Sequence, residues 1–214
     1  MNQYSRSSFA LRSRPSSSRT IDPEFLLTAY ANGYFPMADS KTGEINWYSP
    51  DPRTIFDLEQ FNVPRSVRSV LKKNDFEIRI DTRFEEVMRR CGAREETWIS
   101  EDIVSSYLKL HKLGFAHSVE SWSQDQLVGG LYGVALGGAF FGESMFSLVT
   151  NASKVALVHL VERMVGRGFE LLDTQFNSPH LAMFGAEERS RKEYLQRLQI
   201  ALQKKCRFVE ELHP

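Results

Sequence analysis

AHSVESWSQDQLVGGLYGVALGGAFFGESMFS, residues 116–147, is the stretch that decides the fold. Two short segments of turn-forming residues divide it, Ser123–Asp125 and Leu136–Gly138. The three runs bounded by these turns have the pattern of strands. The pattern therefore predicts three consecutive antiparallel strands, over residues 116–122, 126–135 and 139–147.

A helix and a further strand are predicted directly after these three strands. Asn151 begins an amphipathic pattern that ends at Gly166–Gly168, and residues 169–174 form an apolar strand. Elsewhere the patterns predict a helix that begins at Pro23 with Asp22 as its N-cap and another that begins at Pro64. They also predict helices over 84–91, 100–112 and 190–204, and short strands over 45–48, 54–56 and 76–80. This mixture predicts an α+β fold.

The order of these elements is similar to the core of acyl-CoA N-acyltransferases (the GNAT type), an analogy of fold that carries no function by itself. We expect three parts: a disordered basic tail over residues 1–20, a small N-terminal α/β module over 21–62, and a GNAT-like catalytic domain over 63–214. The tail carries Arg6, Arg12, Arg14 and Arg19 and no acid. Such a composition is typical either of a disordered arm or of a targeting segment.

Composition narrows the classes of function. The 27 basic and 27 acidic residues give a formal net charge of +0, so a nucleic-acid partner would have to meet a local basic patch. No run approaches the ~18 apolar residues of a membrane helix. Cys91 and Cys206 lie far apart, and the five histidines are scattered without metal-ligand spacing. We therefore expect a cytoplasmic protein with reduced thiols and no metal.

Three polar residues interrupt or end predicted apolar strands: Glu143, Asp173 and Gln175. An acid in a central strand is costly unless it is hydrogen-bonded, and the alternative for Glu143 is an edge position facing water. Asp173 ends an apolar strand, where open α/β sheets place ligand groups, although a turn-initiating aspartate is an equally ordinary interpretation. Gln175 shares its face if the strand continues. Because glutamine takes no proton, Asp173 would carry any basic role.

Seven stretches together carry a family resemblance over roughly residues 25–208. They are Gly33–Pro36, Trp47–Arg53, Thr97–Ile99, Leu113–Glu120, Leu127–Val134, Gly142–Ser147 and Asn151–Lys154. In order and spacing they resemble the leucyl/phenylalanyl-tRNA–protein transferase family. Membership implies an aminoacyltransferase of the leucyltransferase type, which moves Leu or Phe, with Met as a further donor, from charged tRNA to the α-amine of proteins beginning with Arg or Lys. The product is marked for N-degron degradation.

The resemblance also implies roles for individual residues. Asp173 and Gln175 resemble the catalytic relay, with Gln175 orienting the amine and Asp173 polarising Gln175. Glu143 resembles the acid that helps to hold the aminoacyl end. Other matching positions line the side-chain pocket or the site of the terminal adenosine: Met145, Leu131, Leu157, Leu172 and Phe176 for the pocket, and Tyr48 and Trp98 for the adenosine. Core packing is the alternative for Trp98 and Met145.

The predicted helix after Pro64 carries a basic stripe without interleaved acids. Arg65, Arg68, Lys72 and Lys73 resemble the cluster that meets acceptor-stem phosphates, and the alternative is a solvated helix face. The chain departs from well-known members just after Gln175. Phe176 stands where they have an aliphatic residue, and Ser178 stands where they have Asn. Of the expectations above, the identity of the donor amino acid depends most on these two positions.

Three rival interpretations remain open. The same reaction could use another pair of substrates, such as Arg transferred to acidic N-termini. An acyl-CoA N-acetyltransferase would need a glycine-rich pyrophosphate loop, whereas residues 147–151 contain no glycine. A non-catalytic RNA- or degron-binding module would need the pocket and the basic helix only. The expected partners are aminoacyl-tRNA and proteins with a basic N-terminus, met by a monomer without membrane contact.

Overall fold

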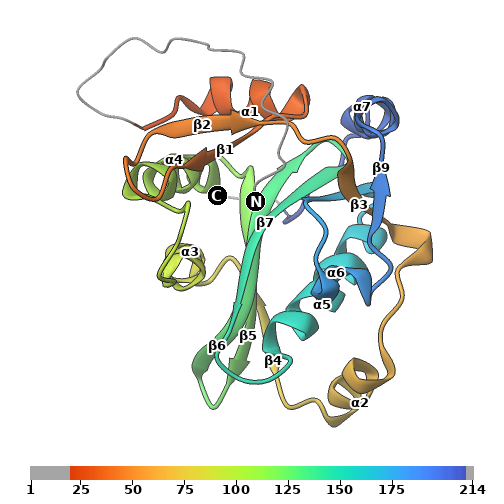
Figure 1. Cartoon of the computed structure of the whole chain (residues 1–214). Helices are drawn as coiled ribbons and strands as arrows, with labels where there is room; N and C mark the ends of the chain where they lie inside the picture. Colours follow the sequence, from red (N-terminus) through yellow and green to blue (C-terminus); the bar gives the residue numbers. More distant parts are fainter. Residues whose placement is uncertain (1–19, 211–214) are drawn as a thin grey trace.

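The computed structural model describes residues 20–210 of the 214-residue chain (Figure 1). The basic tail expected over residues 1–20 lies outside this range apart from Thr20. All of the following concerns the described residues.

Seven strands form one mixed sheet in the order β4-β5-β6-β7-β8-β3-β9. Their bounds are Arg53–Asp57 (β3), Glu77–Ile80 (β4), Ala116–Ser123 (β5), Gln126–Leu136 (β6), Ala139–Ser147 (β7), Leu171–Gln175 (β8) and Glu187–Arg189 (β9). Neighbouring strands are antiparallel apart from β7 and β8, which run parallel. With the helices that cover both faces, this sheet confirms the α+β class.

The predicted three-strand meander is confirmed as β5, β6 and β7, with bounds within one residue of the expected ones. Its turns contain residues in the left-handed backbone region. Gln124 and Asp125 have φ of 50° and 56°, and Gly137 has φ of 58°. Glycine adopts this region without a steric penalty, which is why the second turn was readable from the sequence.

Helices cover the two faces of the sheet unequally and create two cores. The helices are α1 (Pro23–Ala31), α2 (Arg65–Lys73), α3 (Phe84–Gly92), α4 (Glu101–Lys112), α5 (Ala152–Gly166), α6 (Pro179–Ala182) and α7 (Arg191–Leu202). Buried side chains of α1, α3, α4 and α7 form one core, and those of α5, with Val67 of α2, form the other. Glu143 and Asp173 lie between these layers, so the site is built where the two cores meet.

Helix α5 packs very close to the sheet at its first residues. A Cβ on Gly129 of β6 would lie 2.4 Å from the Cβ of Ala152, so only glycine permits this approach. Two details of the prediction were wrong here. Asn151 occupies the N-cap position, but with φ of 70° its side chain makes no capping hydrogen bond. The strand begins at Leu171, because Phe169 belongs to the turn after α5.

The N-terminal region contributes to both the site and the sheet. Asp22 caps α1 by accepting hydrogen bonds from the backbone N–H groups of Glu24 and Phe25, as the sequence predicted for an N-cap. Strands β1 (Phe35–Ala38) and β2 (Ile45–Tyr48) form a separate antiparallel pair. Strand β3, however, lies inside the large sheet between β8 and β9. The division at residue 62 stays a prediction.

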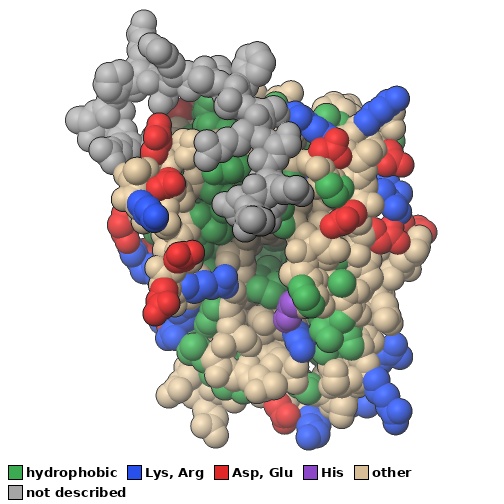
Figure 2. Space-filling view, viewed as in Figure 1, with side chains coloured by type: hydrophobic (Ala, Val, Ile, Leu, Met, Phe, Trp, Pro, Cys, Tyr) green, Lys and Arg blue, Asp and Glu red, His purple; other side chains and the backbone are tan. Residues whose placement is uncertain are grey.

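Strands β7 and β8 separate partway along their length, and this separation creates an opening. Their parallel pairing covers Ala139 to Phe141 on β7 and ends at Asp173 on β8. Beyond this point β7 stays with β6, whereas β8 pairs with β3. Figure 1 shows β7 in the middle, with α3 and α4 to its left, α1 above it, and β3, α6 and α7 to its right. The space-filling view shows a hollow with hydrophobic walls in the same place (Figure 2).

Candidate functional site

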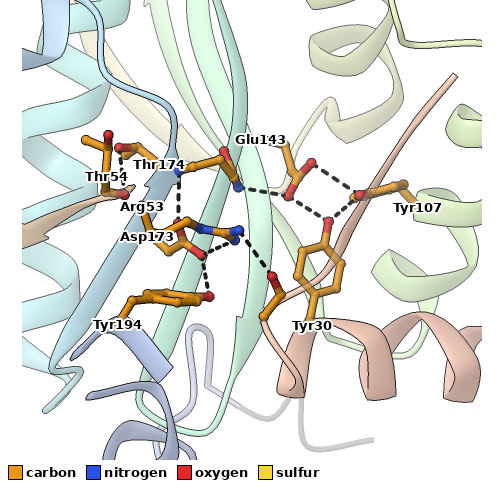
Figure 3. Close-up of polar contacts among 10 residues, drawn as sticks. Tyr30, Arg53, Thr54, Tyr107, Glu143, Asp173, Thr174 and Tyr194 are labelled. Atoms are coloured by element: carbon orange, nitrogen blue, oxygen red, sulfur yellow. Dashed lines mark hydrogen bonds and ion pairs between the residues drawn. The ribbon is translucent and has the colours of Figure 1, made fainter. Parts of the chain in front are cut away.

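Glu143 lies on a β-bulge at this opening. The pairing of β6 with β7 shifts register between Tyr132 and Gly133, which face Ser144 and Gly142, so Glu143 is the extra residue. A bulge re-aims one side chain without interrupting the strand, and bulges occur often beside active sites. The Glu143 carboxylate points toward α1 and α4, where it accepts hydrogen bonds from the hydroxyls of Tyr30, at 2.6 Å, and Tyr107, at 3.2 Å (Figure 3).

The Glu143 carboxyl is placed to titrate near neutral pH. Burial is the largest influence and raises its pKa from the ordinary 4.5 to about 7, although hydrogen bonds from Tyr30 and Tyr107 act in the opposite direction. The negative charge of Asp173 raises the pKa further and the positive charge of Arg53 lowers it. Residue Glu143 is partly exposed, and a carboxyl that is half-ionised at neutral pH is suited to accept and return a proton.

Three tyrosine hydroxyls surround this carboxyl. Tyr30 donates to it at 2.6 Å, and the single proton of the Tyr107 hydroxyl serves either Glu143 Oε2, at 3.2 Å, or the Tyr30 oxygen, with which it is also hydrogen-bonded. Burial first, and the charge of Glu143 second, raise the pKa of Tyr30, Tyr107 and Tyr132 well above 10. The Tyr132 hydroxyl is buried and has no hydrogen-bond partner among residues 20–210. All three hydroxyls therefore stay neutral at physiological pH.

Asp173 is held quite differently. It is fully buried, and its Oδ1 accepts from Arg53 Nε and from the backbone N–H of Gln175, each at 2.9 Å. Its Oδ2 accepts from Arg53 Nη2 at 2.6 Å and from the Tyr194 hydroxyl at 2.7 Å. Four donors thus occupy two oxygens. This geometry argues against Asp173 as the group that takes a proton from a substrate, the basic role that the sequence allotted to it.

Gln175 connects the two carboxylates. Its φ of 59° takes the chain out of the strand conformation, so the alternation of faces assumed from the sequence does not apply. The backbone N–H donates to Asp173, while the side-chain Nε2 lies 3.5 Å from Glu143 Oε1, at the limit of a hydrogen bond. The side-chain amide is therefore turned toward Glu143, and the contact between Asp173 and Gln175 runs through the backbone.

The structure divides the predicted pocket residues into two groups. Leu131, Leu157 and Leu172 are at most 3% exposed and pack with the partly buried Met145 in the core under α5. Phe176 and Trp98 are partly buried against the other core, on the side of Glu143. The three leucines are thus covered by the protein itself, whereas Phe176 and Trp98 remain partly accessible.

Aromatic rings form a continuous wall beside the second group. Phe35 lies 5.7 Å from Phe176, edge to face, and is stacked against Tyr48 at 6.1 Å between ring centroids. Tyr48 is 37% exposed, which leaves its ring free to meet another planar group. The wall matches the predicted placement of Tyr48 near a stacking ligand, a role that stays a prediction.

The basic helix α2 has the expected exposed face. Arg65, Arg68, Lys72 and Lys73 are all exposed, and within residues 20–210 none of them forms an ion pair with an acid. Arg68 is fixed by hydrogen bonds from Nε to Val63 O at 2.7 Å and from Nη2 to Asn62 Oδ1 at 3.3 Å. Figure 2 shows Lys and Arg side chains gathered at the corner where Figure 1 draws α2.

Sequence reasoning missed four polar contributors to the site: Tyr30, Arg53, Tyr107 and Tyr194. Tyr30 and Tyr194 pack inward, and each donates its hydroxyl to a carboxylate. A signal existed for Arg53, because it ends the Trp47–Arg53 stretch. Its partner Asp173 lies 120 residues away, and nothing local to either residue indicates the other.

Comparison with known proteins places this site in a class. A model described as leucyl/phenylalanyl-tRNA protein transferase matches residues 55–199, and a model for the N-terminal domain of the same proteins matches residues 19–51. The chain is thus an aminoacyltransferase. Between residues 20 and 210 no group of three or more His, Cys, Asp or Glu side chains could hold a metal ion, and no helix is long and apolar enough to cross a membrane.

The relatives share most of their length with this chain. It is 53% identical over 189 residues to the leucyl/phenylalanyl-tRNA–protein transferase of Gloeobacter violaceus, covering 88% of this chain and 98% of that protein. The same enzyme of Herpetosiphon aurantiacus is 52% identical, with 89% and 99% covered. The chain belongs to the leucyl/phenylalanyl-tRNA–protein transferase family.

A distant likeness exists among solved structures. The structure of L-PGS from Bacillus licheniformis is similar with a TM-score of 0.46 and 9% identity, over 85% of this chain and 71% of that chain. A likeness of this degree carries no argument about either fold or function.

Proposed function

We propose that this protein transfers Leu or Phe, with Met as a further donor, from charged tRNA to the α-amine of proteins that begin with Arg or Lys, which marks them for N-degron degradation. Family membership supports the reaction class. The observation that carries the proposal is the Glu143 carboxyl, partly exposed at the opening between β7 and β8 and in reach of the Gln175 amide.

The chemistry is the aminolysis of an ester. The amine nitrogen attacks the aminoacyl carbonyl, a C–N bond forms, and the bond between that carbonyl carbon and the ribose oxygen breaks. The amine loses one proton, and the ribose oxygen gains one when it leaves. Glu143, with a pKa of about 7, can accept the first proton and supply the second. The ester is already activated, so placement of the amine beside it supplies most of the rate, up to ~7–11 kcal/mol in ideal cases.

In this proposal Gln175 acts on the amine directly, and Asp173 acts through Gln175. Gln175 is 6% exposed and turns its Nε2 toward Glu143, and in this proposal its carbonyl oxygen orients the amine. Asp173, occupied by four donors, fixes the backbone of Gln175 and supplies negative charge without accepting a proton. The Asp173–Gln175 relay implied by the family is thus retained, with the proton assigned to Glu143.

The proposal places the aminoacyl-tRNA against the aromatic wall, Met145 and the exposed face of α2. The aromatic wall of Phe35, Tyr48 and Phe176, with Trp98 nearby in the same core, offers stacking for the terminal adenosine and one side of a hydrophobic pocket for the side chain. Met145, over the three buried leucines, offers the other side. The exposed face of α2 suits acceptor-stem phosphates, which position a nucleic acid without reading its sequence.

The proposal also covers the wider setting. The parallel β7–β8 pair that separates beyond Asp173, after an antiparallel meander, supports the GNAT-like arrangement of the catalytic domain. A cytoplasmic monomer that acts without a cofactor is the simplest state in which the opening meets both a charged tRNA and a protein N-terminus.

A transfer assay tests this function. tRNAs charged with Leu, Phe, Met or Arg are each offered with peptides that begin with Arg, Lys, Asp or Glu. We expect Leu and Phe to be transferred to the peptides beginning with Arg or Lys. Transfer of Arg to acidic N-termini would support the rival substrate pair. Binding of charged tRNA without any transfer would leave a non-catalytic module and contradict the proposal.

A further inference from the structure

Arg53 is the largest fully buried side chain of the described residues, with 0% of its surface exposed. Arginine is almost never fully buried unless it is paired. The residue ends the Trp47–Arg53 stretch, which is part of the family resemblance but has no assigned role in the reaction. Its position on β3, beside β8, brings it directly behind the residues of the site.

The guanidinium of Arg53 is held on every side. Nε and Nη2 form a bidentate pair with the Asp173 carboxylate, at 2.9 and 2.6 Å, and Nη1 donates to the Gly33 carbonyl at 3.1 Å. Its Cζ also lies over the rings of Phe35 and Tyr194, 4.8 and 4.6 Å from their centroids. Only the fork of an arginine matches both carboxylate oxygens at once, so a lysine cannot reproduce this contact.

The pair reaches the site through Gln175. Asp173 Oδ1, which Arg53 fixes, also accepts the backbone N–H of Gln175. This hydrogen bond holds Gln175 at a φ of 59°, a conformation that a residue with a side chain adopts only when its surroundings impose it. With this turn in the backbone, the Gln175 amide lies 3.5 Å from Glu143 Oε1.

Resting on the proposed aminoacyl transfer, we propose that Arg53 is a positioning residue of the reaction. It fixes the Asp173 carboxylate, and thereby the backbone turn that presents the Gln175 amide to Glu143, and it touches neither substrate nor reacting atoms.

The same pair also affects the charge on Glu143, which gives the proposal a measurable signature. The ionisable groups around Glu143 are Tyr30 of α1, Tyr107 of α4, Tyr132 of β6, and the pair Asp173 and Arg53. The tyrosines are neutral. Arg53 and Asp173 act on the pKa of Glu143 in opposite directions. Without Arg53, its lowering influence on the pKa of Glu143 is lost, while Asp173 keeps its hydrogen bonds from Tyr194 and Gln175. The pKa of Glu143 then rises.

Kinetics of Arg53→Met test the proposal, with Arg163→Met as the matched control. Arg163 also donates to a backbone carbonyl, Phe208 O at 2.7 Å, and lies 5.1 Å from an aromatic ring centroid, but it is remote from Glu143. Per folded molecule, we expect Arg53→Met to lower kcat by roughly 10–100-fold, as misplacement of a catalytic group does. The KM for aminoacyl-tRNA should stay within about threefold. The acidic limb of the pH–rate profile should move to higher pH.

The other variants complete the test. Arg163→Met should leave both kcat and the limb unchanged. Arg53→Lys keeps the charge but loses the bidentate contact with Asp173, so we expect it to restore the acidic limb to its original pH and to restore only part of kcat. If Arg53→Met does not fold, Arg53→Lys alone tests the proposal. A kcat within twofold of the unaltered protein and an unmoved limb, in whichever Arg53 variant folds, would overturn the proposal. Absence of transfer by the unaltered protein would instead overturn the proposed function.

Discussion

Glu120 and Glu143 are two acids in central strands of one sheet, and the protein treats them differently. Glu120 on β5 is fully buried and accepts four hydrogen bonds, from Thr82 Oγ1, Arg83 N, Ser118 Oγ and Trp122 Nε1. Glu143 on β7 lies on a bulge, partly exposed, with two tyrosine donors and one amide at 3.5 Å. Both carboxylates lie where an unpaired acid would be costly. Full satisfaction by fixed donors makes Glu120 a structural element, whereas incomplete satisfaction beside an opening leaves Glu143 able to react.

The largest expected difference between the two acids is in catalysis. Glu143→Gln removes the proton acceptor and should lower kcat by about 10²–10⁴-fold, the usual contribution of general acid–base catalysis. Glu120→Gln, the matched control, should leave kcat per folded molecule unchanged. Single-turnover transfer from preformed aminoacyl-tRNA measures both. Equal losses in the two variants would mean that the distinction is not one of chemistry.

The next largest effect that we expect is on the pH dependence of the transfer rate. Since the base must be ionised, the rate should fall about tenfold per pH unit below the pKa of Glu143, which is about 7. The profile of Glu143→Gln should lose this limb. A limb below pH 5 in the unaltered protein would show that Glu143 is not the titrating group. The α-amine of the acceptor, with a pKa of about 7.7–8.0, also titrates nearby, so an acceptor amine of lower pKa separates the two.

For stability we expect the reverse: Glu120→Gln should have the larger cost in the free energy of unfolding. Glu120→Gln turns an NH₂ group toward donors that need an acceptor, so we expect a loss of at least about 2 kcal/mol in the free energy of unfolding. Urea unfolding at pH 7.5 measures it, with Glu77→Gln on the exposed end of β4 as a control for the loss of one charge. A change within about 0.5 kcal/mol would contradict the structural role of the four donors.

The smallest effect is a gain of stability in Glu143→Gln. A pKa raised from 4.5 to about 7 on folding means that ionised Glu143 destabilises the protein. This cost is absent below pH 4.5, grows as pH rises to 7 and is complete above it. Its full value is roughly 3 kcal/mol, and partial exposure reduces it. We expect Glu143→Gln to be about 1–2 kcal/mol more stable at pH 8, and no more stable at pH 4.5. Equal stability at both values would contradict the pKa.

Much of the fold was predictable, because it rests on local patterns. The meander was visible from strand-forming runs and from Gly137 at a turn, and α1 from Asp22 and Pro23. Glu143, Asp173 and Gln175 stood out as polar residues in apolar strands, and the structure brings them together.

The arrangement around these residues was not predictable, since it depends on pairing between distant segments. The bulge at Glu143 exists only in the register of β6 against β7. The left-handed conformation of Gln175 has no signal, because the residue is not glycine. The Arg53–Asp173 pair joins residues 120 positions apart. Sequence reasoning therefore found the acids but assigned the proton to Asp173, whose four donors only the structure reveals.

The position of β3 between β8 and β9 determines when the site can exist. Strand β3 is made early in synthesis, yet both of its neighbours are among the last strands of the chain. Until they emerge, Arg53 has no carboxylate to pair with and its strand has no edge to join. Domains fold as units during synthesis, and contacts between distant residues form late. An unfinished chain that holds Glu143 but lacks β8 therefore also lacks Asp173 and Gln175, and its Arg53 has no partner in the sheet.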